Sequence, residues 1–276
     1  MPDETRPDFI EALARGLDVI RAFTPRREAM NLSDPKRATM SLSEVAAATG
    51  LHRPTARRIL LTLAELGYVR ADNGQFALTP RVLELGMAYI SAMGIWDLAR
   101  PHLESLVAQT HESSSLAQLD GSDIVYVARV AVPKVITIAV TIGTRFPALQ
   151  TSLGKALLAS LSPEELEKTL AEPSRSGILP KWNPAPEERD RALREVHERG
   201  WALADEDLAP GIRSIATAVC DGGERPIAAL NISVHAAETS VETLTERYLP
   251  LLLQTAQAIS SDWTLRSQRP EIDVAG

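Results

Sequence analysis

The stretch SLSEVAAATGLHRPTARRILLTLAEL, residues 41–66, decides the fold of the N-terminal part of the chain. Ser41 and Glu44 have the S-x-x-E spacing of a capping box, which predicts that a helix begins near Ser41. Gly50 can adopt the left-handed conformation that ends a helix. Pro54 suits the first position of a second helix, where a missing N–H group costs nothing. The stretch therefore predicts two short helices joined by a tight turn.

The second of these helices has an apolar face and a polar face. Apolar side chains recur at three- and four-residue steps and predict a buried stripe of Ala56, Ile59, Leu60, Leu63 and Leu66. The remaining surface carries cations and hydroxyls at Arg53, Thr55, Arg57, Arg58 and Thr62. A short helix, a turn and a helix with cations at its start are typical of a helix-turn-helix, whose second helix enters the DNA major groove. The alternative is an ordinary helical hairpin with solvated arginines.

A β-hairpin is predicted directly after the second helix. Apolar runs at 68–70 and 75–78 flank Asp72-Asn73-Gly74, and Asn-Gly between such runs is a strong hairpin signal. A hairpin at this place makes the module a winged helix-turn-helix. Arg70 on the hairpin could reach a backbone phosphate, or it could be a solvated arginine at a strand end.

Segments on both sides complete the N-terminal domain. Residues 9–23 are predicted to form a helix that packs against the other two through Ile10, Leu13, Ala14, Leu17 and Ile20. We expect residues 24–39 to be a disordered surface loop, with a phosphate-contacting arm as the alternative. Thr79 and Pro80 begin a further helix that we expect to link the two domains and that could pair with its copy in a partner chain.

The charge of the chain is unevenly distributed. The 276 residues have a formal net charge of −7. Residues 1–80 contain 11 Lys and Arg against 10 Asp and Glu, whereas residues 81–276 contain 18 against 26. Within 51–70, four arginines face a single glutamate. The acidic total therefore does not exclude DNA, and it favours a nucleic-acid partner at one end of the chain only.

The composition excludes several other classes. A length of 276 residues allows two domains with sizeable cores. The single cysteine, Cys220, cannot form an intrachain disulfide and suits a reducing cytosol. We expect no membrane span, because no apolar run is long enough, and no signal peptide, because the chain begins with the polar stretch MPDETRPDF. Without a second cysteine or paired histidines, we expect no metal site and no cofactor.

The C-terminal part mixes strands and helices without a βαβ alternation, which predicts an α+β domain. Expected strands cover 115–119, 124–130, 136–142, 212–219 and 226–234. Expected helices cover 96–110, 152–161, 163 onward, 187–199 and 241–262. We expect the residues after 266 to be a disordered tail.

Two places in this part could bind a small molecule. The helix that begins at Ser152 follows a loop with Arg145, and its N-terminal dipole could attract a carboxylate. Ser152 could instead serve only as the helix cap. Asn231 and Ser233 share one face of an otherwise apolar strand, and Ser214 lies on its neighbour. These three are candidates for polar contacts to a ligand, with hydroxyls satisfied by the backbone as the alternative. The five histidines lie beside no catalytic motif, so we do not expect an enzyme.

With these motifs in view, the chain resembles the IclR family of bacterial transcription factors from about residue 10 to 264. The resemblance is carried by LARGLDVIRAF, LSEVAAATGL, RRILLTLAELGYV, LQTSLGKALLA, GWALADEDLAPGIRSIA and PIAALNIS. The chain looks most like the subgroup that controls breakdown of protocatechuate and 4-hydroxybenzoate through the β-ketoadipate pathway.

The resemblance implies an α+β architecture with four parts. These are a winged helix-turn-helix DNA-binding domain (9–79), a linker helix (80–94), a GAF-like effector-binding domain with an antiparallel sheet flanked by helices (95–265) and a disordered tail (266–276). It also implies dimers formed through the DNA-binding end, which associate into tetramers.

Carried over residue by residue, the resemblance assigns two sites. Arg53, Thr55, Arg57 and Arg58 would meet DNA. The effector pocket would be lined by Ser152, Leu153, Gly154, Ser214, Asn231 and Ser233. The chain departs from the family in a longer loop at 24–40, and in Pro54, which stands where many members carry a phosphate-contacting serine.

The expected function is a cytoplasmic transcriptional regulator. It would bind a palindromic operator in double-stranded DNA and respond to a small aromatic or dicarboxylic acid. The alternative is an enzyme that acts on an aromatic acid through residues 95–265.

Overall fold

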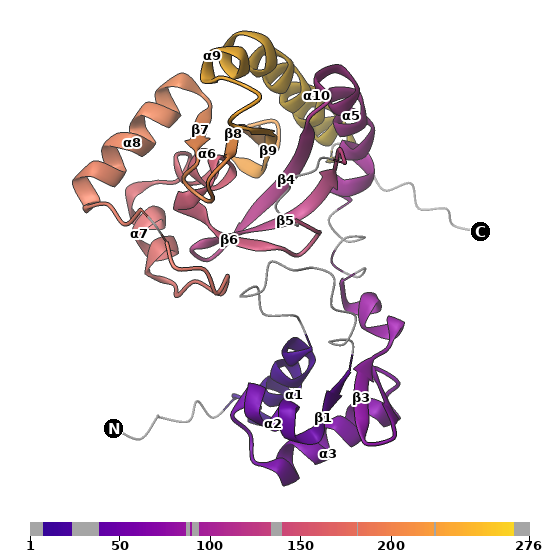
Figure 1. Ribbon diagram of the computed structural model, residues 1–276. Coiled ribbons are helices and arrows are strands. Elements are labelled where there is room, and N and C mark those ends of the chain that lie inside the picture. Colours follow the sequence, from indigo (N-terminus) through magenta and orange to yellow (C-terminus); the bar gives the residue numbers. More distant parts are fainter. Residues whose placement is uncertain are drawn as a thin grey trace, which may run out of the picture. The chain divides into compact units, whose positions relative to one another are not determined.

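The computed structural model divides the chain between Ala92 and Met93 into two compact units (Figure 1). The structure describes residues 8–23, 39–86, 89, 94–133, 140–180, 182–223 and 225–267. Each unit is considered by itself below.

Among its described residues, the N-terminal unit has the helices α1 (Glu11–Ala22), α2 (Leu42–Thr49) and α3 (Arg53–Glu65), helical residues at 83–86 and a three-stranded antiparallel sheet (Figure 1). The 3-10 turn η2 (Pro80–Val82) follows α3 and the sheet. The strands are β1 (Met40–Ser41), β2 (Val69–Asp72) and β3 (Gln75–Leu78), in the order β1-β3-β2. The predicted winged helix-turn-helix is confirmed.

Local signals in the sequence account for the ends of these elements. Ser41 and Glu44 form both hydrogen bonds of the predicted capping box at the start of α2, and Gly50 ends that helix with a φ of 67°. Asn73 and Gly74 form the hairpin turn with φ values of 49° and 77°. Helix α3 begins at Arg53, so Pro54 occupies its second position and not the first.

The core of this unit differs in two places from the predicted one. Three residues expected to be buried, the N-cap Ile10 and Leu13 and Leu17 of α1, are 67%, 62% and 41% exposed. Helix α1 is apolar on two adjoining faces, and Val19 and the C-cap residue Phe23 contribute to the core formed by the described residues of this unit. Leu66, also expected to be buried, is exposed because α3 ends at Glu65 and Leu66 follows as its cap.

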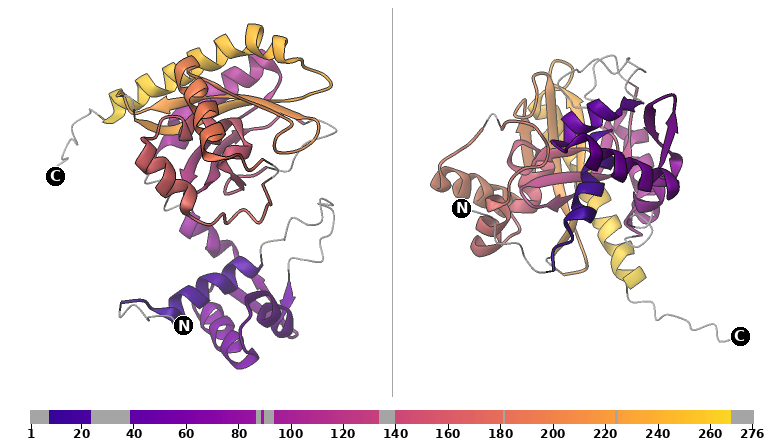
Figure 2. Two further views of the ribbon diagram at one scale, coloured as in Figure 1. Left: turned by 90° about the vertical axis from the view of Figure 1, so that its left-hand side faces the viewer. Right: turned by 90° about the horizontal axis from the view of Figure 1, so that it is seen from below.

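The described residues of the C-terminal unit form a six-stranded antiparallel sheet with helices on both faces (Figures 1 and 2). Its strands are β4 (Ser113–Asp120), β5 (Asp123–Val130), β6 (Arg145–Pro147), β7 (Ala202–Asp205), β8 (Ile212–Cys220) and β9 (Pro226–His235), in the order β6-β5-β4-β9-β8-β7. Its helices are α5 (Ile95–Thr110), α6 (Ser152–Leu158), α7 (Pro163–Ala171), α8 (Pro186–Arg199), α9 (Val241–Thr243) and α10 (Leu249–Ser267). Two short segments complete it, the 3-10 turn η3 (Ala148–Gln150) and the π-helical turn η4 (Leu244–Tyr248). The predicted α+β class is confirmed.

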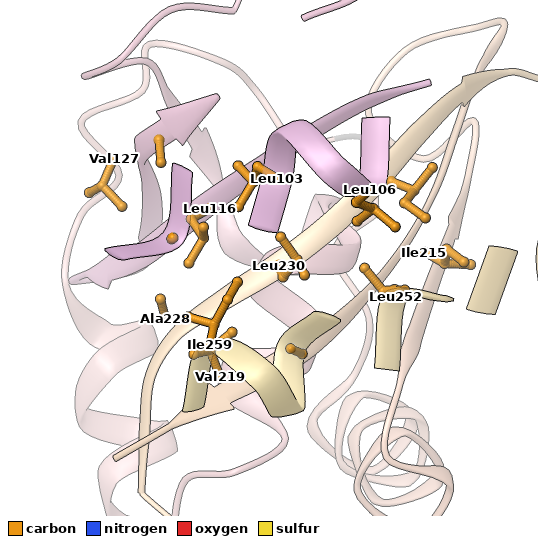
Figure 3. Close-up of a cluster of buried hydrophobic side chains, with 14 of the residues drawn as sticks. Leu103, Leu106, Leu116, Val127, Ile215, Val219, Ala228, Leu230, Leu252 and Ile259 are labelled. Atoms are coloured by element: carbon orange, nitrogen blue, oxygen red, sulfur yellow. The ribbon is translucent and has the colours of Figure 1, made fainter. Parts of the chain in front are cut away.

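Side chains alternate between two cores on the two faces of this sheet. Ala228 and Leu230 of β9 point to the face covered by α5 and α10, where they share a core with Leu103 and Leu252 (Figure 3). Ile232 of β9 belongs to the same core. The intervening Ala229 belongs to the core under α6 and α8. The two faces of the sheet therefore carry separate hydrophobic cores.

The sequence missed two strands of this sheet. The three residues of β6 include a proline and carry little strand signal, so the sequence predicts a loop there. The acidic run that follows β7 masks the strand pattern of its four residues. Both lie at the edges of the sheet. Most of the expected strand at 136–142 lies outside the described residues, as do 24–38 and 268–276.

Candidate functional site

The outer surface of α3 carries exposed cations. Arg53, Arg57 and Arg58 are exposed, whereas Thr55 is half-buried. Within the described part of the chain, no carboxylate lies within ion-pair distance of these three guanidinium groups. The helix is held from its opposite side by Ala56, Leu60 and Leu63, which are all buried. Packing therefore fixes the helix while its cations remain available.

The two remaining residues expected near DNA differ in their surroundings. Thr62 is exposed, but its hydroxyl donates a hydrogen bond to the carbonyl oxygen of Arg58 at 3.0 Å, so only its acceptor capacity is free. Arg70 is exposed on β2, next to a hairpin tip that is also exposed. Thr62 of α3 and Arg70 of β2 are therefore both exposed to solvent in the N-terminal unit.

A cavity lies in the C-terminal unit, on the side of the sheet that α6 covers. Its volume, about 60 Å³, exceeds several-fold the roughly 10–15 Å³ that one water molecule needs. The lining comes from all six strands of the sheet, from η3 and the start of α6, and from the loops before β6 and after β7. The polar residues in the described lining are Ser113, Tyr126, Arg129, Gln150, Thr151, Ser152, Ser214, Asn231, Ser233 and His235, and no acidic residue is among them.

Strand register arranges the cavity floor in rows. Directly opposed residues of antiparallel strands share a face, so Arg129, Ser115 and Asn231 form one row across β5, β4 and β9. Ser113, Ser233 and Ser214 form the next row across β4, β9 and β8. His235 and Ile212 form the third row.

Arg129 brings a positive charge to the cavity wall. Its Nη1 donates a hydrogen bond to Ser115 Oγ at 2.9 Å, and among the described residues no carboxylate pairs with it. Burial lowers the pKa of this guanidinium, yet arginine keeps its charge at neutral pH. The wall thus contains a half-buried cation without an internal counterion.

Asn231 supplies further donors beside this cation. Its Oδ1 accepts the backbone N–H of Ser115 at 3.0 Å, which leaves the Nδ2 amide without an acceptor among the residues that the structure describes. Asn231 is only 3% exposed and lines the cavity. Burial without a partner is costly for an amide, so this group is suited to a ligand oxygen.

The start of α6 differs from its predicted role. Thr151, not Ser152, caps the helix by accepting the N–H of Gly154 at 2.9 Å. Ser152 instead shares a hydrogen bond with Ser214, Oγ to Oγ at 2.8 Å, in the cavity wall. The Thr151 cap occupies one of the N–H groups expected to attract a carboxylate, and Arg129 provides the positive charge.

The six residues assigned to the pocket by resemblance lie in or directly behind its wall. Ser152, Leu153, Ser214, Asn231 and Ser233 line the cavity. Gly154 lies behind the lining and packs so tightly that an added Cβ would be 2.1 Å from the carbonyl oxygen of Ala148. Its role is close packing.

The sequence did not identify Arg129, His235, Tyr126 or Phe146 as cavity residues. The rings of Tyr126 and Phe146 pack edge to face, with their centroids 5.8 Å apart. A single cation in the apolar strand DIVYVARV was a usable signal for Arg129. No local pattern marks the other three, because they meet only through the pairing of β4, β5, β6 and β9.

The described residues contain neither a group of three or more possible metal ligands nor a helix with the length and apolarity of a membrane span.

Comparison with known sequences relates both units to one family. The profile of the IclR helix-turn-helix domain matches residues 12–73, and that of the bacterial transcriptional regulator IclR C-terminal domain matches residues 87–261. The chain is 34% identical to the Pca regulon regulatory protein of Pseudomonas putida over 91% of this chain and 83% of that protein. It is 32% identical to the p-hydroxybenzoate hydroxylase transcriptional activator of Acinetobacter baylyi over 91% of each.

Comparison with solved structures gives relatives of the same kind as the sequence comparison. A transcriptional regulator from Rhodococcus sp. RHA1 aligns with a TM-score of 0.77 and 43% identity, over 94% of this chain and 100% of that chain. A double mutant of the PobR inducer-binding domain from Acinetobacter, in complex with 3-hydroxybenzoic acid, aligns with a TM-score of 0.54 and 29% identity, over 59% of this chain and 96% of that chain. The chain therefore belongs to the IclR family of bacterial regulators and is a DNA-binding transcriptional regulator.

Proposed function

We propose that this regulator binds a palindromic operator through α3 and is switched by a small aromatic acid bound in the cavity of the C-terminal unit. The observation that carries the second part is Arg129, a half-buried cation that pairs with no carboxylate among the described residues and lies in a cavity whose described lining has no acidic side chain. A buried charge is costly unless it is paired. A ligand carboxylate would supply that pair, and the Asn231 amide in the same row would donate a second hydrogen bond.

An aromatic ring suits the remaining walls. Tyr126, Phe146, Leu153, Leu208 and Ile212 provide apolar surface around the row of small serines. Ring faces and edges pack well against such surroundings. The names of two relatives refer to the Pca regulon and to p-hydroxybenzoate hydroxylase, and the related PobR domain was solved with 3-hydroxybenzoic acid. A hydroxybenzoate is thus the first ligand to test, and a dicarboxylic acid is the alternative.

For the DNA, we propose that Arg57 and Arg58 reach bases or phosphates in the major groove. We further propose that Arg53, Thr55 and Thr62 contact the same groove and that Arg70 contacts the backbone beside it. Free guanidinium groups on the outer face of a packed helix support this assignment. A regulator that binds chromosomal operator DNA acts in the cytoplasm, and this is the location that we propose.

Two copies of α3 are needed to read a palindrome, so we propose a dimer formed through the DNA-binding unit. The exposed apolar side chains Phe9, Ile10, Leu13 and Leu17 on and beside α1 are suited to a second copy of this chain. Pairing of dimers into tetramers through the C-terminal units is the further step that the family suggests.

The switch would act by population shift. An effector changes DNA affinity only if it binds the two arrangements of the dimer with different affinities. In our proposal the C-terminal unit senses the acid and does not transform it.

Operator binding measured with and without 4-hydroxybenzoate tests the proposal. Fluorescence anisotropy of full-length protein on DNA from the promoter next to its gene should give a salt-dependent affinity that 4-hydroxybenzoate changes at least threefold. Absence of salt-dependent DNA binding would refute the DNA assignment, and an unchanged affinity would refute the effector assignment. Mass spectrometry of the incubated acid should recover it unaltered, whereas turnover would favour the enzyme alternative.

A further inference from the structure

His235 occupies the third row of the cavity floor, two rows from Arg129. It ends β9, lines the cavity and shares a face with Asn231 and Ser233. Its Nδ1 accepts the backbone N–H of Ala237 at 3.2 Å. An imidazole that accepts at Nδ1 carries its proton at Nε2 when it is neutral. His235 therefore presents Nε2–H as a donor.

The Nε2 end of the ring has room because Gly211 has no side chain. An added Cβ on Gly211 would lie 3.1 Å from Nε2, and Gly211 has a φ of 78°, which disfavours other residues. Among the described residues, none accepts a hydrogen bond from Nε2. The neighbouring lining residues Ile212 and Leu208 are apolar. His235 is thus the polar group at this end of the cavity.

The two polar ends are separated by the length of one substituted ring. Asn231 and His235 are four residues apart on β9, which corresponds to about 13 Å along a strand. Hydrogen bonds of about 3 Å at each end leave about 7 Å for the ligand. A benzoic acid with an oxygen at the para position has this span.

We propose that His235 is a specificity-determining residue that donates a hydrogen bond to an effector oxygen at the end opposite the carboxylate. This inference rests on the proposed function, in which the carboxylate binds beside Arg129. The effector class is then narrowed to aromatic acids with a hydrogen-bond acceptor in the para position, which 4-hydroxybenzoate represents.

Two probes of equal shape test this in the wild-type protein. The para substituent of 4-methylbenzoate has the size of the hydroxyl group of 4-hydroxybenzoate but offers no acceptor. Isothermal titration calorimetry on full-length protein should give a Kd about tenfold lower for 4-hydroxybenzoate, the effect of one net hydrogen bond. Equal affinities for the two acids would overturn the inference and leave the proposed function intact.

Variants then assign the discrimination to the imidazole. His235→Phe removes the donor and keeps a ring, so the two acids should bind within about twofold of each other. His235→Gln keeps an amide donor near the position of Nε2 and should retain part of the preference. As a matched control, Arg129→Gln should weaken both acids by a similar factor and leave their ratio unchanged.

The outcomes separate the two proposals. A wild-type ratio near ten that persists in a folded His235→Phe protein, judged by circular dichroism, overturns the role of His235 alone. Failure of the wild-type protein to bind either acid overturns the proposed effector class and this inference with it. If His235→Phe does not fold, the ratio of the two Kd values in the wild type and its partial loss in His235→Gln still test the role of His235.

Discussion

Arg129 Nη1 donates a hydrogen bond of 2.9 Å to Ser115 Oγ, and this is the contact that holds a cation in the wall of the cavity. The two residues face each other across β5 and β4. Ser115 in turn donates its backbone N–H to Asn231, so the guanidinium and the amide are positioned by one continuous row. The row is rigid because all of its strands lie inside the sheet.

Replacement of Arg129 should weaken ligand binding without lowering the stability of the ligand-free protein. Arg129→Gln should weaken binding of 4-hydroxybenzoate by about 10- to 100-fold, since hydrogen bonds to charged groups contribute about 1.5–3 kcal/mol. The same change removes an uncompensated charge, so the ligand-free variant should unfold at the same or a higher temperature. Thermal unfolding with and without the acid measures both effects. Equal ligand-induced shifts in variant and wild type would exclude Arg129 from the site.

Loss of the cations on α3 should weaken operator binding. Arg57→Ala and Arg58→Ala should each cost about 1–3 kcal/mol where a bidentate base contact is lost, or flatten the salt dependence where a phosphate contact is lost. Arg191→Ala is the control, because this exposed arginine lies on α8 in the other unit. Anisotropy titrations at several salt concentrations distinguish the cases. Wild-type affinity in both α3 variants would rule out the groove assignment.

The exposed apolar stripe on and beside α1 (Phe9, Ile10, Leu13 and Leu17) should control dimer formation. Leu13→Lys and Leu17→Lys place charges on a surface that we assign to a second copy, so they should shift the protein toward monomers and weaken operator binding together. Arg21→Glu, a change at an exposed position outside the stripe, is the matched control. Light scattering after size-exclusion chromatography reports the mass. An unchanged dimer would place the interface elsewhere.

The capping box of α2 should be sensitive to pH. Hydrogen bonds from Ser41 lower the pKa of the Glu44 carboxyl. A carboxyl with a lowered folded-state pKa stabilises the fold above its unfolded pKa and loses that contribution as the pH falls through the folded one. Glu44→Ala removes the carboxylate that accepts the backbone N–H of Ser41. It should therefore speed hydrogen exchange in α2 at neutral pH, and the difference from wild type should shrink at acid pH.

A second capping box supplies the control for that experiment. Ser162 and Glu165 form the same pair at the start of α7. Ser162→Ala should speed exchange in α7 and leave α2 unaffected. A pH-independent difference between wild type and Glu44→Ala would mean that the charge of the carboxylate does not contribute.

Gly154 should tolerate no side chain. An added Cβ would lie 2.1–2.5 Å from three backbone atoms of Ala148, and backbone cannot move aside as a flexible side chain can. Gly154→Ala should destabilise the C-terminal unit by about 1–3 kcal/mol and lower effector affinity, because Ser152 and Leu153 would shift. Gly223→Ala, where the nearest atom would be 3.5 Å away, is the control. Denaturant unfolding followed by circular dichroism compares the two.

Several parts of the fold could be read from local signals. The capping boxes at Ser41 and Ser162, the left-handed glycines at 50 and 200 and the Asn73-Gly74 turn act over a few residues, so short patterns predict them. Burial within an element was harder to predict. The apolar faces of α1 compete, and only the surrounding unit decides that Val19 and not Leu13 enters the core.

The sequence by itself determined the helix-turn-helix, the cationic face of α3 and the α+β class, because helix caps, turns and residue periodicity are local properties of the chain. Only the tertiary structure decided that Arg129, Asn231 and His235 meet in one cavity, that Thr151 caps α6 and that Gly154 lies behind the wall. The physical reason is strand register: Arg129 and Asn231 are 102 positions apart in the chain, and hydrogen bonding of both strands to β4 brings them into one row.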